Sequence, residues 1–218
     1  MKVQPEVPKD TQRPRVKICG ITSAEAAYCA LTAGADAIGL VFYADSPRHV
    51  SIEQAKDIAH NAGPLVTLVG LFVNAQPQQV NETVAQVPLN LLQFHGDESA
   101  EYCQQFTLPY LKAIHMKPGI DVREIINNYA SASGILLDTY RKGLPGGTGE
   151  CFDWQRVPHH PIRPIILAGG LTPENVRQAI TIAKPYGVDV SGGVECAPGI
   201  KDEERIYAFM HNVKQGAV

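Results

Sequence analysis

Residues 164–193 read PIILAGGLTPENVRQAITIAKPYGVDVSGG and contain two short apolar runs, each followed by a pair of glycines. Apolar runs of this length, bounded by turn residues, are typical of parallel strands that are covered on both faces. The segment between them opens with Thr172-Pro173, a capping residue followed by the proline that helices accept in their first turn. The stretch therefore predicts a strand, a helix and a second strand, with a glycine loop after each strand.

The same alternation of apolar runs and amphipathic segments extends through the rest of the chain. Strand and helix repeated in this way predict a parallel sheet, and eight repeats predict an α/β fold made of a single (β/α)8 barrel. A doubly wound open sheet is the alternative, but it usually needs fewer units, and no GxGxxG turn follows the first strand. The predicted strands are VKIC from Val16, AIGLVF from Ala37, LVTLVGLF from Leu65, LNLLQF from Leu89, YLKAI from Tyr110, GILLD from Gly134, PIILAG from Pro164 and VDVSG from Val188.

The barrel is expected to occupy residues 15–218 as one domain. Residues 1–14, MKVQPEVPKDTQRP, contain three prolines and several charges, and we expect them to form a flexible N-terminal extension. This segment lacks the apolar core of a secretory signal, and no run approaches the roughly 18 apolar residues that span a membrane. The five cysteines form no CxxC pair, which favours reduced thiols in a cytoplasmic protein over disulfides or a zinc site.

Charge limits the range of partners. The chain carries 19 Lys and Arg against 22 Asp and Glu, a net charge of −3, and the basic residues do not cluster. Binding to nucleic acid normally requires a basic stripe that follows the phosphates, so we expect no nucleic-acid partner. A membrane partner is not expected either, and both a monomer and a homodimer remain open.

Candidate site residues follow from the barrel prediction, because barrel active sites lie at the carboxyl ends of the strands. Gly169-Gly170 follow the seventh predicted strand and Gly192-Gly193 follow the eighth, the two loops where such barrels often bind phosphate. Backbone N–H groups at a helix start attract anions, and glycine lets the backbone approach them closely. One pair alone would favour a tight turn, but two pairs in adjacent loops predict a site for a small phosphorylated molecule.

Two side chains at strand ends offer acid–base chemistry. Cys19 lies between the first strand and a helix start, where a positive helix end or a cation lowers a thiol pKa and makes the thiolate a usable base. Asp138 closes the apolar run of residues 135–137, where burial raises a carboxyl pKa and allows it to act as an acid. A small buried thiol and a helix-capping or ion-paired carboxylate are the alternatives.

Arginine and histidine side chains near the strand ends are weaker candidates. Arg48 can bind a carboxylate through two parallel hydrogen bonds, although its position alone favours a surface arginine. His49 and His95 either line the pocket or are structural histidines, and we assign them no catalytic role. We expect no metal centre, because the sequence contains no HxH, HExxH or carboxylate–histidine cluster.

The motifs taken together resemble one family. From Val16 to the region of Arg205, the chain is similar to phosphoribosylanthranilate isomerase, a barrel enzyme of tryptophan biosynthesis. The ordered set is specific, since related phosphate-binding barrels do not carry all of it. The matching motifs are KICGIT at Lys17, GLVF followed by SPR ending at Arg48, LVGLFVN at Leu68, LLQFHGDE at Leu91, LLD at Leu136, GGTGECFDW at Gly146, LAGGLTPENV at Leu167, and GVDVSGGVE at Gly187 with PGIKD from Pro198.

The resemblance implies a cofactor-free Amadori rearrangement of N-(5-phosphoribosyl)anthranilate to 1-(2-carboxyphenylamino)-1-deoxyribulose 5-phosphate. It implies Cys19 as the general base, Asp138 as the general acid and Arg48 as the ligand of the anthranilate carboxylate. The family often has DVSSGVE where this chain has DVSGGVE, so Gly192 keeps a backbone N–H but lacks a hydroxyl. The other expected substrate contacts are Gly147, Gly149, Gly169, Gly170, Asp189, Ser191, Gly192 and Gly193.

Two other functions remain open. A different phosphosugar isomerase or epimerase barrel would need a metal or paired aspartates and would lack the motif around Cys19. A non-catalytic barrel that only binds a phosphoribosyl ligand would not need Cys19 and Asp138 together. Sensitivity to chelators and turnover of the substrate separate these possibilities.

Overall fold

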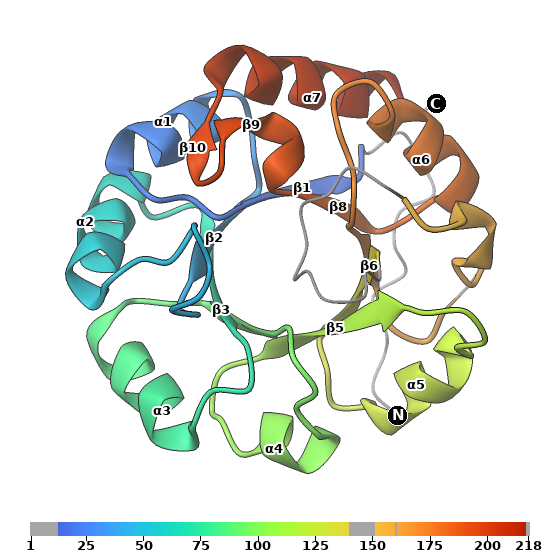
Figure 1. Cartoon of the computed structure of the whole chain (residues 1–218), viewed down its shortest axis with the longest axis horizontal. Helices are drawn as coiled ribbons and strands as arrows, with labels where there is room; N and C mark the ends of the chain where they lie inside the picture. The colour runs from blue at the N-terminus through green and yellow to red at the C-terminus, as the bar shows by residue number, and fades with distance from the viewer. Residues whose placement is uncertain (1–12, 140–150, 160, 217–218) are drawn as a thin grey trace.

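The computed structural model describes residues 13–139, 151–159 and 161–216. Within these residues, eight parallel strands pair in chain order and close into a barrel, with the helices around its outside (Figure 1). Closure confirms the (β/α)8 prediction and excludes the doubly wound open sheet. The strands are β1 (Arg15–Cys19), β2 (Ala37–Val41), β3 (Thr67–Phe72), β4 (Leu91–Phe94), β5 (Tyr110–Met116), β6 (Gly134–Thr139), β7 (Ile165–Leu167) and β8 (Gly187–Val190).

The connections between the strands are mostly helical. In the part of the chain that the structure describes, only the short 3-10 helix η1 (Trp154–Arg156) lies between β6 and β7. After β8 come the 3-10 helix η2 (Gly192–Val194) and a hairpin of β9 (Glu195–Ala197) and β10 (Ile200–Lys201). The α-helices are α1 (Ala24–Thr32), α2 (Ile52–Ala62), α3 (Pro77–Gln86), α4 (Ala100–Gln104), α5 (Val122–Asn128), α6 (Val176–Ala183) and α7 (Glu203–Gln215).

Alternate residues of a strand face opposite sides of the barrel wall, because successive side chains point in opposite directions. In β1, Val16 and Ile18 pack in the main apolar cluster with the surrounding helices, whereas Cys19 packs with Val41 and Leu71 in a separate small cluster. Full burial of a large apolar side chain contributes about 1.5–3 kcal/mol. The outer cluster therefore stabilises the fold, and the inner face is available for the polar groups of a site.

The helix after β7 begins later than the sequence predicts. Helix α6 starts at Val176, and Thr172 does not cap it. Instead, the backbone N–H of Thr172 donates to Oδ1 of Asn175 at 2.8 Å, and residues 173–175 form a turn. The predicted helix start at Pro173 is therefore wrong. The backbone that follows the Gly169-Gly170 loop is a turn, and the first turn of the helix comes only after it.

The predicted N-terminal extension is described only at its last two residues, Arg13 and Pro14. Nη1 of Arg13 lies 2.6 Å from Oδ2 of Asp36, and Nη2 donates to the carbonyl of Gly34. The chain is therefore attached to the barrel from residue 13 onward. Residues 1–12 lie outside the described residues, and the flexibility of the extension stays a prediction.

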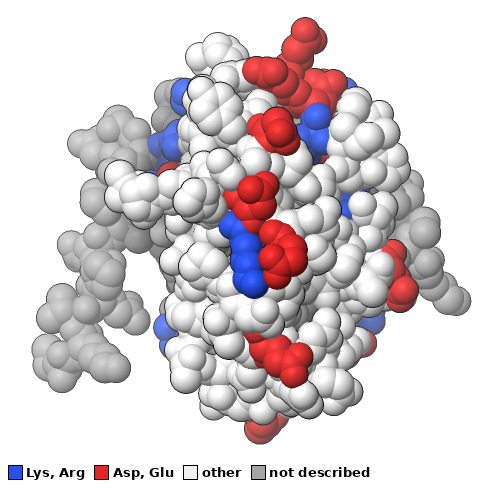
Figure 2. Space-filling view, turned by 90° about the vertical axis from the view of Figure 1, so that its left-hand side faces the viewer, with Lys and Arg blue, Asp and Glu red and all other residues white. Residues whose placement is uncertain are grey.

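The surface carries charges of both signs. On the face shown in Figure 2, acidic and basic side chains are interspersed and no continuous basic stripe crosses the view. Among the described residues, no helix is both long enough and apolar enough to cross a bilayer. The expected lack of nucleic-acid and membrane partners stays a prediction.

Candidate active site

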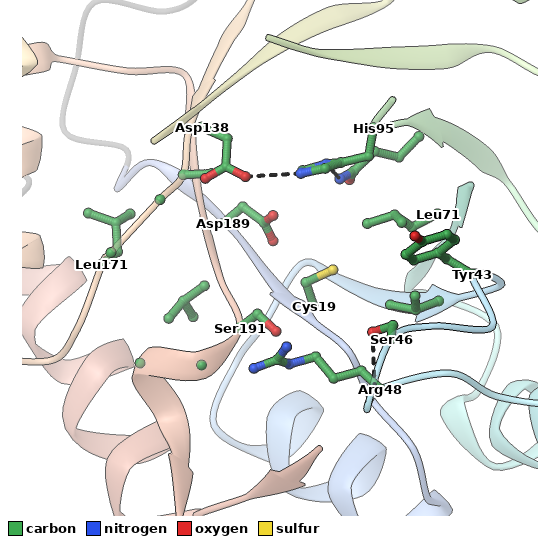
Figure 3. A pocket seen from close by; sticks show the side chains of 18 of the residues that line it. Cys19, Tyr43, Ser46, Arg48, Leu71, His95, Asp138, Leu171, Asp189 and Ser191 are labelled. Atoms are coloured by element: carbon green, nitrogen blue, oxygen red, sulfur yellow. Dashed lines mark hydrogen bonds and ion pairs between the residues drawn. The ribbon is translucent and has the colours of Figure 1, made fainter. Parts of the chain in front are cut away.

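The carboxyl ends of the barrel strands surround a cavity of about 420 Å³, a size that suits a small molecule. Figure 3 shows side chains from opposite sides of the barrel mouth, including those of Cys19 and Asp138, around this space. Gly147 and Gly149 lie outside the described residues. The predicted site residues that line the cavity are Cys19, Arg48, Asp138, Gly169, Gly170, Asp189, Ser191, Gly192 and Gly193.

Cys19 ends β1 and is buried in the cavity wall, with 5% of its surface exposed. Gly39 on the neighbouring strand leaves room for it, because a Cβ there would lie 2.8 Å from the sulfur. Burial raises the pKa of the Cys19 thiol above its ordinary value, and the opposing effects of Lys17 and Lys201 do not outweigh burial. The expected lowering is therefore wrong: a cation is present, but desolvation is stronger, and the thiol form predominates at neutral pH.

A buried ion pair lies beside Cys19. The register of β1 and β8 sets Lys17 opposite Asp189, and Nζ of Lys17 lies 2.8 Å from Oδ1 of Asp189. Burial lowers the pKa of the Lys17 ammonium, but Asp189 and Cys19 outweigh burial and raise it overall, so the lysine is charged. Lys17 is not among the predicted site residues, although its position two residues before Cys19 on a strand places both side chains on one face.

We expect Lys17→Met to make Cys19 less reactive at neutral pH, because the ammonium favours the thiolate and methionine brings no charge. Alkylation by iodoacetamide reports the thiolate. The midpoint of the alkylation rate against pH should move to higher pH. At neutral pH the alkylation rate should fall by about tenfold or more. Lys17→Arg keeps the charge and is the control. An unchanged alkylation profile in a Lys17→Met protein with a cooperative melting curve would contradict this role.

Asp138 lies in β6 and both of its carboxyl oxygens accept hydrogen bonds. Oδ1 accepts the backbone N–H of Thr139 at 2.8 Å, and Oδ2 lies 2.9 Å from Nε2 of His95. Burial raises the pKa of Asp138, but the contacts with His95, His115 and Thr139 outweigh burial, so the pKa is lowered. The expected rise is wrong, because His95 and His115 come from other parts of the barrel and favour the charged form, and the local sequence does not reveal them. Asp138 is therefore a carboxylate in the free protein.

Two histidines surround Asp138. Nδ1 of His95 lies 2.9 Å from the amide nitrogen of Gln93, and the rings of His95 and His115 meet edge to face with centroids 5.3 Å apart. Donor atoms of His95, His115 and Asp138 lie within 4.8 Å of one another, close enough to hold a metal ion. The sequence pattern missed this cluster because its members come from three strand ends. Since His95 and Asp138 are hydrogen bonded to each other, we interpret the cluster as an acid–base network, and the lack of a metal stays a prediction. His49 is exposed and does not line the cavity.

Arg48 is held by a carboxylate that the sequence analysis did not consider. Its Nε and Nη2 donate to the two carboxylate oxygens of Glu195, each at 2.7 Å, and Lys201 donates to the same carboxylate at 2.7 Å. Burial raises the pKa of Glu195, but the two cations outweigh burial and lower it overall. Glu195 and Lys201 lie on the β9–β10 hairpin, beyond the barrel strands, so the strand-end rule did not find them. Arg48 is a fixed guanidinium at the cavity rather than a surface arginine.

The two glycine loops form the rim of the cavity on one side. Gly169 and Gly170 have φ angles of 79° and 68°, a region that favours glycine. A side chain at Gly193 would collide with the backbone of Leu171, so the two loops pack backbone against backbone. Arg205, which the sequence analysis also missed, lines the cavity and donates from Nε to the carbonyl of Gly193 at 3.0 Å. Close-packed backbone beside a cation suits an anion such as phosphate.

The fold and the cavity define an enzyme of the (β/α)8-barrel class, with a thiol, a carboxyl and two glycine loops around one pocket. Comparison with known proteins supplies the family. The family model for N-(5'phosphoribosyl)anthranilate (PRA) isomerase matches residues 16–212, and the chain belongs to this family. The resemblance that the motifs indicated is confirmed.

Individual relatives match nearly the whole chain. An N-(5'-phosphoribosyl)anthranilate isomerase from Cellvibrio japonicus is 60% identical over 195 residues, which cover 89% of this chain and 91% of that protein. The crystal structure of phosphoribosyl anthranilate isomerase from Thermotoga maritima has a TM-score of 0.86 and 41% identity, covering 93% of this chain and 99% of that one. A structure of such an isomerase in complex with reduced 1-(o-carboxyphenylamino)-1-deoxyribulose 5-phosphate has a TM-score of 0.80 and 39% identity over the same shares.

Proposed function

We propose that this chain isomerises N-(5-phosphoribosyl)anthranilate to 1-(2-carboxyphenylamino)-1-deoxyribulose 5-phosphate, as a cytoplasmic step of tryptophan biosynthesis. The observation that carries the proposal is that Cys19 and Asp138 line one cavity together with Arg48 and two glycine loops. Family membership and the phosphorylated ligand in the structure of a relative support it. The reaction needs no cofactor, and the protein acts as a monomer or a homodimer.

The cavity offers a contact for each charged end of this substrate. The loops at Gly170 and Gly193, with Arg205 beside them, bind the phosphate. Arg48, oriented by its two hydrogen bonds to Glu195, binds the anthranilate carboxylate. A substrate fixed at both ends spans the barrel mouth, so the energy of binding goes into orienting the ribose.

The chemistry moves one proton onto oxygen and one off carbon. Asp138 donates a proton to the ribose ring oxygen, the bond from that oxygen to C1′ breaks, and the ring opens to an iminium ion. The thiolate of Cys19 then removes the C2′ proton, giving an enolamine that becomes the aminoketose. The free protein favours the thiol and the carboxylate instead. The reactive form, with a thiolate at Cys19 and a protonated Asp138, has the same number of protons as the free form. The two forms differ only in whether one proton is on Cys19 or on Asp138.

Turnover by the purified protein tests the proposal directly. Conversion of N-(5-phosphoribosyl)anthranilate is followed as the loss of its fluorescence, and we expect steady-state turnover with saturation. Other phosphorylated sugars serve as comparison substrates. Binding of the substrate without turnover would favour the non-catalytic barrel, and faster turnover of another phosphosugar would favour a different isomerase.

We expect treatment with EDTA, followed by its removal, to leave turnover unchanged, because no proposed step involves a metal ion. The same assay with Mg²⁺ or Zn²⁺ added back is the control. Loss of activity after EDTA that returns with a divalent cation would point to a metal-dependent phosphosugar epimerase instead. It would also give the donor cluster around Asp138 a role as a metal site.

A further inference from the structure

The proposed reaction needs a proton on Asp138, yet this carboxyl is bound in a way that favours its charged form. The backbone N–H of Thr139 donates to Oδ1 at 2.8 Å, and Nε2 of His95 lies 2.9 Å from Oδ2. Hydrogen bonds to both oxygens stabilise a carboxylate. The second partner is an imidazole, the side chain that ordinarily gains and loses its proton near neutral pH. The proton for the reaction therefore has a nearby source.

We propose that the acid is a pair, in which His95 holds the proton and delivers it to the substrate through Asp138. This inference rests on the proposed function. The imidazolium of His95 gives its Nε2 proton to Oδ2 of Asp138 and becomes neutral. Oδ2 passes the proton to the ribose ring oxygen as the bond to C1′ breaks, and the electrons of that bond stay on the oxygen. The lone pair of the substrate nitrogen forms the C1′=N bond, so protons and charge balance.

Gln93 can satisfy His95 in both of its protonation states. Gln93 lies on β4, fully buried, with its amide nitrogen 2.9 Å from Nδ1 of His95. Its Oε1 is buried and has no hydrogen-bond partner in the described part of the chain. An amide donates from one side and accepts on the other. With the NH₂ toward Nδ1, the amide suits the neutral imidazole that carries its proton on Nε2. Turned over, its oxygen gains the partner that it lacks, because it accepts the Nδ1–H of the imidazolium and of the neutral ring that remains after Nε2 has given up its proton.

The surroundings favour His95 over its neighbour as the proton holder. Burial lowers the pKa of His115, and His95 lowers it further, so His115 is neutral. Nζ of Lys112 contacts the carboxylate of Glu98 at 2.9 Å, which offsets the charge of that lysine. In the part of the chain that the structure describes, Asp138 and His115 contact the His95 ring directly. Nζ of Lys112 donates to the carbonyls of the residues on either side of His95. The titratable or charged side chains that line the same cavity include Tyr43 after β2, Asp189 on β8 and Cys19 on β1.

The variant His95→Gln distinguishes two roles of His95, which are holding the proton and positioning Asp138. The glutamine amide reaches the place of Nε2 and keeps a hydrogen bond to Asp138, but it cannot hold the proton. We expect kcat to fall by about 10²-fold or more while KM changes little, since the substrate contacts are elsewhere. His49→Gln is the matched control, because it makes the same change at an exposed histidine that does not line the cavity. This control should retain the wild-type pH profile of kcat.

Two substitutions of Gln93 test whether His95 holds the proton, because they should shift the pH at which His95 loses it in opposite directions. Gln93→Glu places a carboxylate against Nδ1–H and stabilises the imidazolium, and Gln93→Met removes the hydrogen bond. The pH at which the ring nitrogens of His95 lose a proton is read from their NMR shifts, and one limb of the kcat profile should have the same midpoint. Both midpoints should move to higher pH in Gln93→Glu and to lower pH in Gln93→Met.

Two results overturn the inference. One is a wild-type enzyme whose NMR midpoint for His95 coincides with neither limb of the kcat profile, a test that needs no variant. The other is a His95→Gln enzyme with normal kcat and an unchanged pH profile. Failure of the proposed function is recognised separately, because the wild-type enzyme would then not turn over N-(5-phosphoribosyl)anthranilate at all.

Discussion

Replacing Cys19 by serine is expected to lower kcat/KM for N-(5-phosphoribosyl)anthranilate by about 10²- to 10⁴-fold. Serine has nearly the shape of cysteine, but its hydroxyl is a far weaker acid and supplies no anion at neutral pH to remove the C2′ proton. Cys19 contacts the small cluster with Val41 and Leu71, and serine fits the same space. The loss should therefore appear in turnover, with substrate binding largely retained. Steady-state kinetics and a binding titration measure the two effects.

The control for this substitution is Cys196→Ser, which makes the same chemical change at an exposed cysteine on β9. We expect this variant to have wild-type kinetics. The melting temperature of both variants is measured alongside, so that loss of folded protein is recognised. Near-normal turnover in Cys19→Ser would remove Cys19 from the role of base.

The second large effect is expected for Asp138→Asn, with kcat lower by about 10²- to 10⁴-fold. The amide keeps the size of the carboxyl and an oxygen for the backbone N–H of Thr139, but it cannot pass a proton to the ribose ring oxygen. Its NH₂ would also face Nε2 of His95, so a donor would meet the ring nitrogen that now contacts a carboxylate. KM should change little, because the phosphate and carboxylate contacts lie elsewhere in the cavity.

Asp97→Asn is the matched control for the acid, since Asp97 is exposed near the same end of the barrel and does not line the cavity. It should leave the kinetics unchanged. Single-turnover measurements with Asp138→Asn distinguish a slow chemical step from slow product release. A normal rate of ring opening in this variant would contradict Asp138 as the group that protonates the substrate.

Most of the fold could be predicted because its signals are local. Eight apolar runs separated by amphipathic segments indicate parallel strands covered on both faces, and each run falls on an observed strand. The start of α6 could not be predicted in the same way. Thr172-Pro173 has the composition of a helix start, but the side chain of Asn175 accepts the backbone N–H of Thr172 and residues 173–175 form a turn instead.

The predicted site residues that the structure describes all reach one cavity, because the carboxyl ends of all eight strands meet at the same end of a barrel. The expected pKa directions of Cys19 and Asp138 were wrong for a related reason. The residues that bury Cys19 and the histidines beside Asp138 come from other parts of the barrel, and no local motif records them.

The sequence by itself determined the barrel, the strand ends that carry Cys19 and Asp138, and the two glycine loops, because these depend on residues that are neighbours along the chain. Only the tertiary structure decided which charges meet. It pairs Lys17 with Asp189, Arg48 with Glu195, and His95 with Asp138 across long stretches of chain. Closing the barrel brings these residues within hydrogen-bond distance and removes water from around them. Those two effects, rather than residue type, set where the protons of this site are held.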